Sequence, residues 1–370
     1  MKVLHIISGL GNGGAEKVLY KLSVSDRGNK HYVVSLMNEG VYGESLKKNG
    51  IPVYCLNMKR GSISFKGVVE MFSILRKIKP DTVQTWMYHA DLIGGILAKL
   101  AGCKDIVWGI RGPYNKDITS LSTKAVIYTC AVLSRFIPNS IASNSIYAIE
   151  AHVKCGYDRK KFKYIPNGYD IGMYKPSSAT VKKIRKEFGL HKNSVLLGMV
   201  ARFDPYKDHE NLLRALHILS KQRKGFVCVL VGTGMDKANT VLIEMIEKYS
   251  LKGIVKLVGA RYDIPHIMEA LDLHVLSSVA ESFPNVIAEA MMCETVCVTT
   301  DAGDASNIVD ETGWVVPASD PKALANAISS AMGEMEDASL WGERGHKCRA
   351  RIADNFSLNK MIESYLSIWS

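Results

Sequence analysis

Three features that would place this 370-residue sequence in other protein classes are missing from it: a long apolar run, a signal peptide and a metal-binding cysteine cluster. The longest apolar stretch, AVIYTCAVLSRFI from Ala125, is interrupted by polar residues well short of the ~20 residues that span a bilayer. The opening MKVLHIIS has neither the basic region nor the cleavage site of a signal peptide, so we expect a cytoplasmic protein. The eight cysteines form no CxxC pair and no Cys/His cluster at zinc spacing, and we interpret them as reduced core residues.

Acidic residues are scarce in the first half of the sequence. Residues 1–170 contain 24 Lys and Arg against 12 Asp and Glu, a net charge of +12, whereas residues 171–370 contain 23 against 24, a net charge of −1. A basic surface attracts phosphate-bearing partners such as nucleic acid, an anionic membrane or a phosphorylated lipid; the alternative is a basic surface that serves solubility. Because the sequence has no recognisable recognition helix, zinc finger or aromatic–basic interleaving, we do not expect nucleic acid as the partner.

Short apolar runs alternate with helical patterns in both halves of the sequence. In the first half KVLHII, HYVVSL, PVYCL and DTVQT each precede a helical stretch, and in the second half SVLLGMV and FVCVLVG do. This alternation predicts an α/β architecture of parallel sheets covered on both faces, with ligands at the carboxyl ends of the strands. Residues 166–178 interrupt the pattern with two prolines, two glycines and two serines. We therefore predict two Rossmann-like, doubly wound domains, 1–172 and 173–355, that face each other across a cleft.

A glycine loop, SGLGNGGAE, follows the first predicted strand and leads into a helix. Gly9, Gly11 and Gly14 match the GxGxxG pattern of dinucleotide-binding proteins, which suggests an NAD-dependent dehydrogenase as one alternative. The second strand does not end in the acidic residue that a ribose contact needs, since Glu39 lies beyond it. The residues themselves predict that Gly13 and Gly14 allow close backbone approach of an anion to the helix start; a tight turn without a ligand is the alternative.

The segment ESFPNVIAE follows the strand LDLHVLSS and carries two glutamates. Glu281 stands in a loop before Pro284, which is suited to the start of a helix, and Glu289 lies on that helix. One carboxylate is thus predicted to reach the site from a loop and the other from a helix. Three backbone N–H groups are expected to point out of the helix start toward a phosphate, those of Phe283, Asn285 and Val286.

Two cations flank a Pro-containing turn in ARFDPYKDHENLL, directly after the strand SVLLGMV. Arg202 and Lys207 are predicted to converge at the carboxyl end of this strand, where a diphosphate needs neutralisation. Taken singly, each residue is more often a solvated surface charge.

Taken together, these motifs resemble the retaining glycosyltransferases of family 4, which have a two-domain GT-B fold. The resemblance covers nearly the whole chain, through GGAE, PDTVQTWMYHADLIGG, IPNGYD, ARFDPYK, GARYDIPHIMEALDLHVLSS, ESFPNVIAE and EAMMCETVCVTTDAGDASNIV. It also includes FSLNKMIESYLSIW, and implies that a C-terminal helix within 356–370 packs back on the first domain. The sequence around Trp86, His89 and Arg111 is similar to the branch that builds bacterial O-antigen, lipopolysaccharide and capsule.

The resemblance implies a role for each motif residue. Arg202 and Lys207 hold the donor diphosphate, Glu289 binds the nucleotide ribose and Glu281 contacts hydroxyls of the donor sugar, so Glu281, Arg202 and Lys207 form the predicted catalytic group. The other predicted donor-binding residues lie in the glycine loop, in the loop near the base and at the helix start: Gly13, Gly14, Arg261, Phe283, Pro284, Asn285 and Val286.

The sequence departs from the family pattern in two places. Many members carry a His-Gly pair after the fifth strand, where this chain has Arg111 and Gly112, so a catalytic histidine at that position is excluded. Arg111 and His89 are predicted on the acceptor or donor-sugar side. Glu294 replaces a turn glycine in EAMMCE, which affects the local backbone more than the chemistry.

The resemblance also implies a mechanism and a set of partners. We expect front-face attack with retention of configuration, no cofactor and no metal ion, because no DxD-type acidic pair lies at a strand end. The expected partners are a UDP-sugar donor, a polyprenyl-diphosphate-linked acceptor and the anionic cytoplasmic face of the inner membrane, contacted through Lys59–Lys79 and Arg159–Lys163. The alternatives are a sugar-nucleotide epimerase of the same fold and a phosphate- or nucleic-acid-binding protein. No oligomeric state is predicted.

Overall fold

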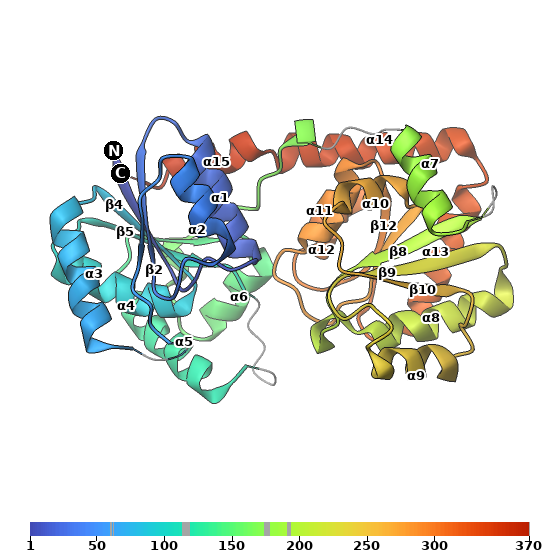
Figure 1. The fold of residues 1–370 in the computed structure, drawn as a ribbon, viewed down its shortest axis with the longest axis horizontal. Helices are drawn as coiled ribbons and strands as arrows, with labels where there is room; N and C mark the ends of the chain where they lie inside the picture. Colours follow the sequence, from blue (N-terminus) through green and yellow to red (C-terminus); the bar gives the residue numbers. More distant parts are fainter. Residues whose placement is uncertain (60, 62, 113–118, 174–177, 191–193, 370) are drawn as a thin grey trace. The chain divides into compact units, whose positions relative to one another are not determined.

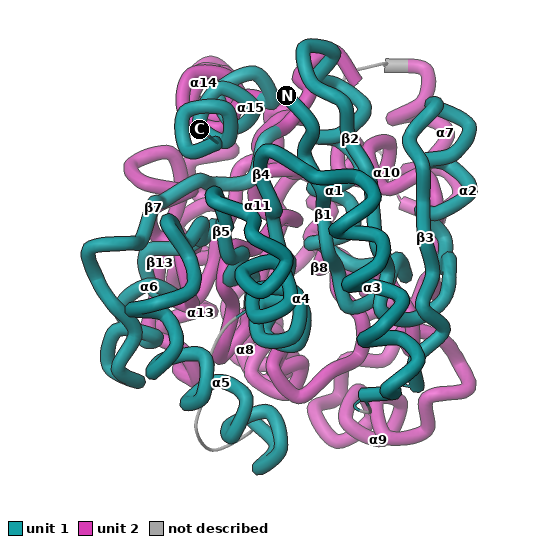
Figure 2. The backbone as a smooth tube through the Cα atoms, turned by 90° about the vertical axis from the view of Figure 1, so that its left-hand side faces the viewer, with its two compact units in different colours: residues 1–168, 358–370 teal, residues 169–357 magenta. Residues whose placement is uncertain are grey.

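The computed structural model describes residues 1–59, 61, 63–112, 119–173, 178–190 and 194–369. The chain folds into two compact units, distinguished by colour in Figure 2: unit 1 contains residues 1–168 and 358–370, and unit 2 contains residues 169–357. Each unit contains one wholly parallel β-sheet, so the predicted class of Rossmann-like α/β sheets is confirmed. The units divide at residues 168 and 357, where the sequence pattern placed boundaries at 172 and 355.

Unit 1 is built on a seven-stranded sheet with the order β3-β2-β1-β4-β5-β6-β7. The strands are β1 (Lys2–Ile7), β2 (Lys30–Ser35), β3 (Val53–Cys55), β4 (Thr82–Trp86), β5 (Asp105–Ile110), β6 (Ser140–Ser143) and β7 (Phe162–Tyr164). Every residue of β4 and β5 is buried, as expected for strands covered on both faces. The strand order reverses between β1 and β4, and such a switch point is where ligands bind in open α/β sheets.

Helices cover both faces of the unit 1 sheet (Figure 1). One face is covered by α3 (Phe65–Ile78), α4 (Tyr88–Leu100) and α5 (Leu121–Leu133), and the other by α1 (Gly14–Ser25), α2 (Gly40–Lys48) and the C-terminal α15 (Leu358–Leu366); α6 (Ile146–Lys154) precedes β7. Alternating side chains of β1 serve the two layers, since Leu4 and Ile6 pack on the α3–α5 side and Val3 and Ile7 on the other.

Serine caps fix where several of these helices begin. The side-chain oxygen of Ser64 accepts the Gly67 N–H at 3.1 Å at the start of α3, and Ser120 accepts the Thr123 N–H at 3.3 Å at the start of α5. Serine at this position satisfies one of the N–H groups that the first helical turn leaves unpaired. The two serines therefore fix the residues at which α3 and α5 begin.

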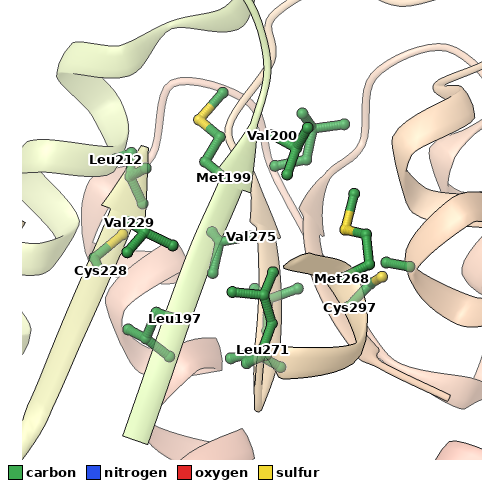
Figure 3. Close-up of a cluster of buried hydrophobic side chains, with 14 of the residues drawn as sticks. Leu197, Met199, Val200, Leu212, Cys228, Val229, Met268, Leu271, Val275 and Cys297 are labelled. Carbon is green, nitrogen blue, oxygen red and sulfur yellow. The ribbon is translucent and has the colours of Figure 1, made fainter. Parts of the chain in front are cut away.

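Unit 2 is built on a six-stranded sheet with the order β10-β9-β8-β11-β12-β13. The strands are β8 (Val195–Val200), β9 (Phe226–Val231), β10 (Val255–Gly259), β11 (Leu273–Leu276), β12 (Val296–Thr300) and β13 (Trp314–Val316). Leu197, Val229 and Val275 come from three adjacent strands and meet in one continuous core (Figure 3). The order reverses between β8 and β11, which makes their carboxyl ends the expected ligand position.

The helices of unit 2 are α7 (Ser178–Glu187), α8 (His209–Gln222), α9 (Thr240–Lys248), α10 (Ile264–Ala270), α11 (Asn285–Met292), α12 (Ala305–Val309), α13 (Pro321–Glu334) and α14 (Ala338–Asn355). Asn239 fixes the start of α9 at Thr240, because its side-chain oxygen accepts the Leu242 N–H at 3.1 Å. No helix in the described part of the chain combines the length and the apolar character needed to cross a membrane.

Candidate functional site

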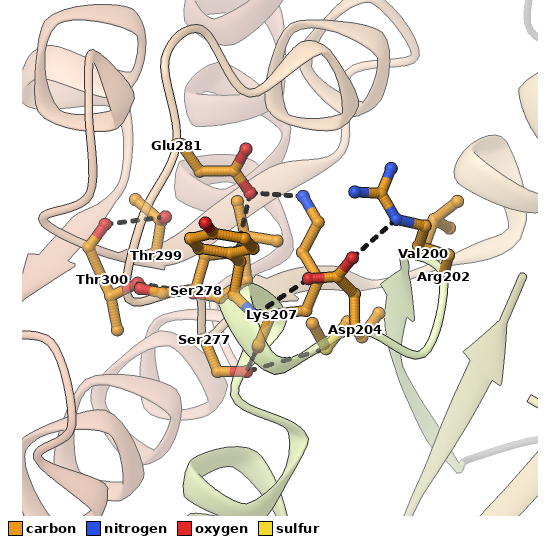
Figure 4. Close-up of polar contacts among 12 residues, drawn as sticks. Val200, Arg202, Asp204, Lys207, Ser277, Ser278, Glu281, Thr299 and Thr300 are labelled. Carbon is orange, nitrogen blue, oxygen red and sulfur yellow. Dashed lines mark hydrogen bonds and ion pairs between the residues drawn. The ribbon is translucent and has the colours of Figure 1, made fainter. Parts of the chain in front are cut away.

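A group of polar side chains gathers at the carboxyl ends of β8, β11 and β12 in unit 2 (Figure 4). Arg202 and Asp204 follow β8, and the short 3-10 turn Pro205–Lys207 brings Lys207 next to the loop after β11. That loop carries Glu281. The site thus lies at the predicted switch point, and the strand ends position its residues.

Lys207 and Glu281 form a largely buried ion pair. The Lys207 ammonium contacts Glu281 Oε1, and the two side chains are only 16% and 12% exposed. The Ser278 hydroxyl donates to the same carboxylate oxygen at 2.7 Å. Glu281 Oε2 points away from this pair (Figure 4) and has no protein partner among the described residues. A buried pair with a second hydrogen bond fixes both side chains and leaves one carboxylate oxygen available to a ligand hydroxyl.

The turn that carries Lys207 is itself clamped to the sheet. Asp204 caps the turn by accepting the Tyr206 N–H at 3.0 Å, and the Ser277 hydroxyl lies 2.9 Å from both the Lys207 and the Asp208 carbonyl oxygens. Asp208 adopts a left-handed backbone with φ 45° and is followed by α8. These bonds hold the Lys207 backbone against β11, so the position of the ammonium does not depend on a flexible loop.

Arg202 is held differently from Lys207. Its Nε donates to Asp204 Oδ2 at 2.9 Å, and its side chain is 66% exposed. Burial raises the pKa of Asp204, but the Tyr206 N–H and the Arg202 guanidinium outweigh burial and hold that pKa below its usual range. The remaining guanidinium nitrogens have no protein partner within the described ranges. Arg202 is therefore oriented by one carboxylate and presents its outer N–H groups to solvent.

Helix α11 contributes the second glutamate of the ESFPNVIAE segment. Glu289 is buried on this helix, and no side chain of the described residues caps the α11 start at Pro284. The Asn285 Oδ1 accepts the Tyr169 hydroxyl at 2.6 Å. Phe283 has a buried side chain that packs edge-on against Phe356 with the ring centroids 5.6 Å apart, so its ring belongs to the core.

Sequence reasoning missed the role of Gly303, which lies in the loop after β12. Gly303 has φ +61°, and a Cβ there would lie 2.5 Å from the Glu281 carbonyl oxygen and 2.6 Å from that of Ser282. Only glycine combines this backbone conformation with such close approach. Gly303 thus allows the loop after β12 to pack directly against the backbone of Glu281 and Ser282.

Arg261 is not bonded into this group. Its guanidinium is held between Asp263, at 2.8 and 2.7 Å, and Glu187 at the end of α7. Asp263 lies two residues away in the same loop, whereas Glu187 lies 74 residues away, so the second contact was not visible in the sequence. Arg261 therefore connects the end of α7 to the loop before α10 through ion pairs with Glu187 and Asp263.

The glycine loop of unit 1 has its own carboxylate at the helix start. Gly13 precedes α1 and Gly14 is its first residue, but a Cβ on Gly13 would lie 2.3 Å from a carboxylate oxygen of Glu16. Burial raises the pKa of Glu16. An acidic residue at the third helical position is a common cap, and the GGAE sequence was the available signal for it. Glu16 therefore lies where Gly13 and Gly14 were predicted to meet an anion.

His89 and Arg111 line one cavity of about 460 Å³ within unit 1. Burial lowers the pKa of His89, which favours the neutral imidazole. The Arg111 guanidinium lies 5.4 Å from the Trp86 ring centroid and donates to the Tyr365 hydroxyl at 2.9 Å and to Asn167. Arg111 therefore also ties the C-terminal helix α15 to the end of the sheet, a structural role that the sequence did not reveal.

The described residues include no cluster of three or more His, Cys, Asp or Glu side chains arranged to hold a metal ion. The charged groups at the unit 2 site are instead two cation–carboxylate pairs, Lys207–Glu281 and Arg202–Asp204.

Comparison with known proteins matches both halves of the chain to glycosyltransferase families. Residues 12–172 match the family described as Glycosyltransferase Family 4, and residues 180–348 match the family described as Glycosyl transferases group 1. The chain is 25% identical over 335 residues to the Escherichia coli UDP-Gal:alpha-D-GlcNAc-diphosphoundecaprenol alpha-1,3-galactosyltransferase, covering 88% of this chain and 84% of that protein.

Two solved structures share the fold. Anabaena Alr3699/HepE in complex with UDP is 24% identical, with a TM-score of 0.87 over 99% of both chains. A glycosyltransferase from Rickettsia africae is 20% identical, with a TM-score of 0.84 over 100% of this chain and 97% of that one. The two family matches together span most of the sequence, and the chain belongs to glycosyltransferase family 4, as an enzyme with the GT-B fold.

Proposed function

We propose that this chain is a retaining, metal-independent glycosyltransferase that moves a sugar from a UDP-sugar to a lipid-linked saccharide acceptor in bacterial surface polysaccharide biosynthesis. The observation that carries the proposal is the Lys207–Glu281 pair, buried at the switch point of unit 2 with Arg202 beside it. In this proposal unit 2 binds the donor and unit 1 binds the acceptor.

Two cations and a helix start neutralise the leaving diphosphate. The Lys207 ammonium is shared between Glu281 and a phosphate oxygen, while the exposed guanidinium nitrogens of Arg202 bind a second phosphate oxygen. The first turn of α11, where no side chain of the described residues caps Pro284, directs backbone N–H groups to the same anion. Because these donors are already in place, little reorganisation is needed when negative charge develops on the leaving group.

The two glutamates bind hydroxyl groups in this proposal. Glu281 Oε2 accepts a hydroxyl of the donor sugar, since Oε1 is already used by Lys207 and Ser278. Glu289, on α11, accepts the ribose hydroxyls of the nucleotide. The bond between the anomeric carbon and the diphosphate oxygen breaks, the acceptor oxygen bonds to that carbon on the same face, and the acceptor proton passes to the departing diphosphate.

Two relatives support the choice of substrates. The E. coli relative is named for transfer from UDP-Gal to a GlcNAc-diphosphoundecaprenol, and HepE has been crystallised with UDP-glucose. We therefore propose a UDP-sugar donor, an acceptor built on a polyprenyl diphosphate, and a place of action at the cytoplasmic face of the inner membrane.

A donor screen tests the proposal. The full chain is incubated with UDP- and GDP-sugars and a polyprenyl-diphosphate-linked saccharide, and both free nucleotide and glycosylated lipid are measured. We expect one UDP-sugar to give equal amounts of UDP and product, only when acceptor is present. Release of nucleotide with an epimerised free sugar and no need for acceptor would favour an epimerase instead.

A further inference from the structure

Helix α5 carries exposed apolar side chains on one of its faces. Leu121 and Val132 on this helix are exposed, Leu121 by 82%, and so is Phe136 just beyond the end of the helix. Leu121 and Val132 lie on one side of the helix, while Ile127, Cys130 and Ala131 on the other side are buried in the unit 1 core. A helix that buries one apolar face and exposes a second one has more apolar surface than folding alone requires.

The start of α3 repeats this feature beside the same end of the sheet. Ile63 precedes the helix, and Phe65, Val69 and Phe72 follow at helical spacing; all four are exposed, Phe65 by 84%. Among the described residues of unit 2 the exposed large apolar side chains are isolated on separate elements, for example Val241 on α9. Scattered apolar side chains are usual on protein surfaces, but a clustered set indicates an interaction surface.

The residues around these faces are basic. Lys124 lies on α5 and Arg135 follows it, and residues 121–136 contain no Asp or Glu. On α3 the charged residues are Lys66, Arg76 and Lys77 against a single acid, Glu70. Unit 1 as a whole contains 25 Lys and Arg against 12 Asp and Glu, a net charge of +13. Apolar faces flanked by cations are typical of helices that lie in the interface of an anionic membrane.

The cavity of unit 1 opens between the first turns of these two helices. Its rim includes Ile63 before α3 and Ser120, Ser122 and Thr123 at the start of α5. Its apolar walls come from the strand ends and α4 and include Met37, Met58, Met87 and Ile93. Figure 1 shows α5 along the lower margin of unit 1, where it packs against α4. A surface that contacts both apolar faces would therefore lie directly over the cavity entrance.

We propose that the apolar face of α5, with Ile63, Phe65 and Val69 of the α3 region, docks on an anionic lipid bilayer, so that the unit 1 cavity opens at the membrane surface. The docking itself rests on the exposed residues; that the cavity then receives a lipid-linked acceptor rests on the proposed function. The cluster Arg159–Lys163 is a weaker candidate, because Arg159 pairs with Glu150 and Lys161 donates to two carbonyl oxygens at 2.8 Å. Arg60, also predicted at the membrane, lies outside the described residues.

The test is co-sedimentation of the full chain with vesicles of phosphatidylcholine alone and of equal parts phosphatidylcholine and phosphatidylglycerol. We expect binding to the anionic vesicles, and roughly tenfold or more weaker binding for Leu121→Glu and Val132→Glu, which replace an apolar contact by a repelled charge. Val241→Glu on α9 is the matched control and should bind as the unchanged chain does. UDP affinity, measured on every variant, shows that the fold is retained.

Several results would overturn the proposal: no binding to either vesicle, equal binding to both, or equal loss in the α5 and α9 variants. Self-association that Val132→Glu abolishes, without vesicle binding, would show that a second copy of the chain covers this face. The glycosyl-transfer assay separates the two proposals. Docking with no transfer from any nucleotide sugar would contradict the proposed function but not the docking. Transfer to a soluble acceptor without docking would contradict the docking but not glycosyl transfer.

Discussion

Unit 1 carries 25 Lys and Arg against 12 Asp and Glu, and unit 2 carries 22 against 24, yet the two cations of the candidate anion site, Lys207 and Arg202, lie in unit 2. In unit 2, Lys207 and Arg202 are each fixed by one carboxylate at the switch point of the sheet. In unit 1 some of the cations, such as Lys66 and Lys124, lie on α3 and α5 beside exposed apolar side chains. Net charge therefore does not locate a candidate anion site, because a fixed position in a partly buried environment matters more than the number of cations.

The comparison assigns the diphosphate site to unit 2, and its largest expected effect is the loss of turnover on replacing Lys207. We predict that Lys207→Ala lowers turnover roughly 1000-fold, or about 4 kcal/mol, because the leaving diphosphate loses a preorganised cation and Glu281 loses its partner. Arg202→Ala should cost roughly 100-fold, since its side chain is far more exposed. Steady-state kinetics on folded protein gives both values.

The control is Lys248→Ala, an exposed lysine on α9 that pairs with Glu210 and should leave turnover unchanged. Lys207→Arg keeps the charge and should recover part of the activity. If Lys207→Ala and Arg202→Ala each changed turnover less than threefold, the diphosphate would have to bind elsewhere.

The next effect concerns two histidines buried beside the Lys207 turn. Burial and the nearby Lys207 lower the pKa of His209 to about 4 and that of His274 to about 3, from an ordinary value of 6.5. Below pH 6.5 the unfolded chain takes up protons that the folded chain does not, so stability falls as pH falls. Between pH 6.5 and 5.0 each histidine should cost about 1.6 kcal/mol.

Urea unfolding at several pH values checks this prediction through the slope of the unfolding free energy against pH. His209→Gln and His274→Gln should each remove about one proton from that slope, and the double variant about two. An unchanged slope in both single variants would show that these side chains are protonated in the folded state.

Glu289 and Glu281 are expected to affect different steps, the first nucleotide binding and the second sugar transfer. We predict that Glu289→Ala weakens UDP binding roughly 10- to 100-fold, the size of a lost hydrogen bond to a charged group, while Glu281→Ala mainly slows transfer. Titration calorimetry with UDP gives the affinities, and initial rates give the transfer step. Unchanged UDP affinity in Glu289→Ala would exclude the ribose role.

Arg111 tests whether a cation of unit 1 is mainly structural. Loss of its bonds to Tyr365 and Asn167 and of its stacking on Trp86 should make Arg111→Ala less stable by about 1–3 kcal/mol. Tyr365→Phe should cost about 1 kcal/mol, and the double variant less than the sum. Denaturant unfolding measures all three. A normal stability of Arg111→Ala with a large loss of turnover would assign Arg111 to the acceptor instead.

The sequence predicted the parts of the site that local motifs encode. The Pro-started helix α11, the turn after β8 and the positions of Glu281 and Lys207 follow from patterns within a dozen residues, and the α/β alternation predicted both sheets. Contacts between distant segments were not predictable in this way. Arg111 meets Tyr365 across 254 residues, and Arg261 meets Glu187 across 74.

The exposed face of α5 shows a second reason why sequence reasoning stopped short. Residues 121–136 are apolar on nearly every side, so periodicity alone does not say which face the sheet covers. The structure settles this, because Ile127 and Cys130 are buried while Tyr128 and Val132 are exposed.

The smallest expected effect is that of a metal chelator. In the proposed mechanism Lys207, Arg202 and the first turn of α11 supply the positive charge that a divalent ion supplies in other transferases, and all three are positioned by contacts within unit 2. EDTA should therefore change turnover less than about twofold, since removing a bystander ion leaves the preorganised donors in place. Initial rates with EDTA, with added magnesium and with added manganese check this, and Lys207→Ala measured in parallel shows whether added metal replaces the lost ammonium. A strict requirement for either ion in the unchanged chain would contradict the mechanism and move the diphosphate away from the Lys207–Glu281 pair.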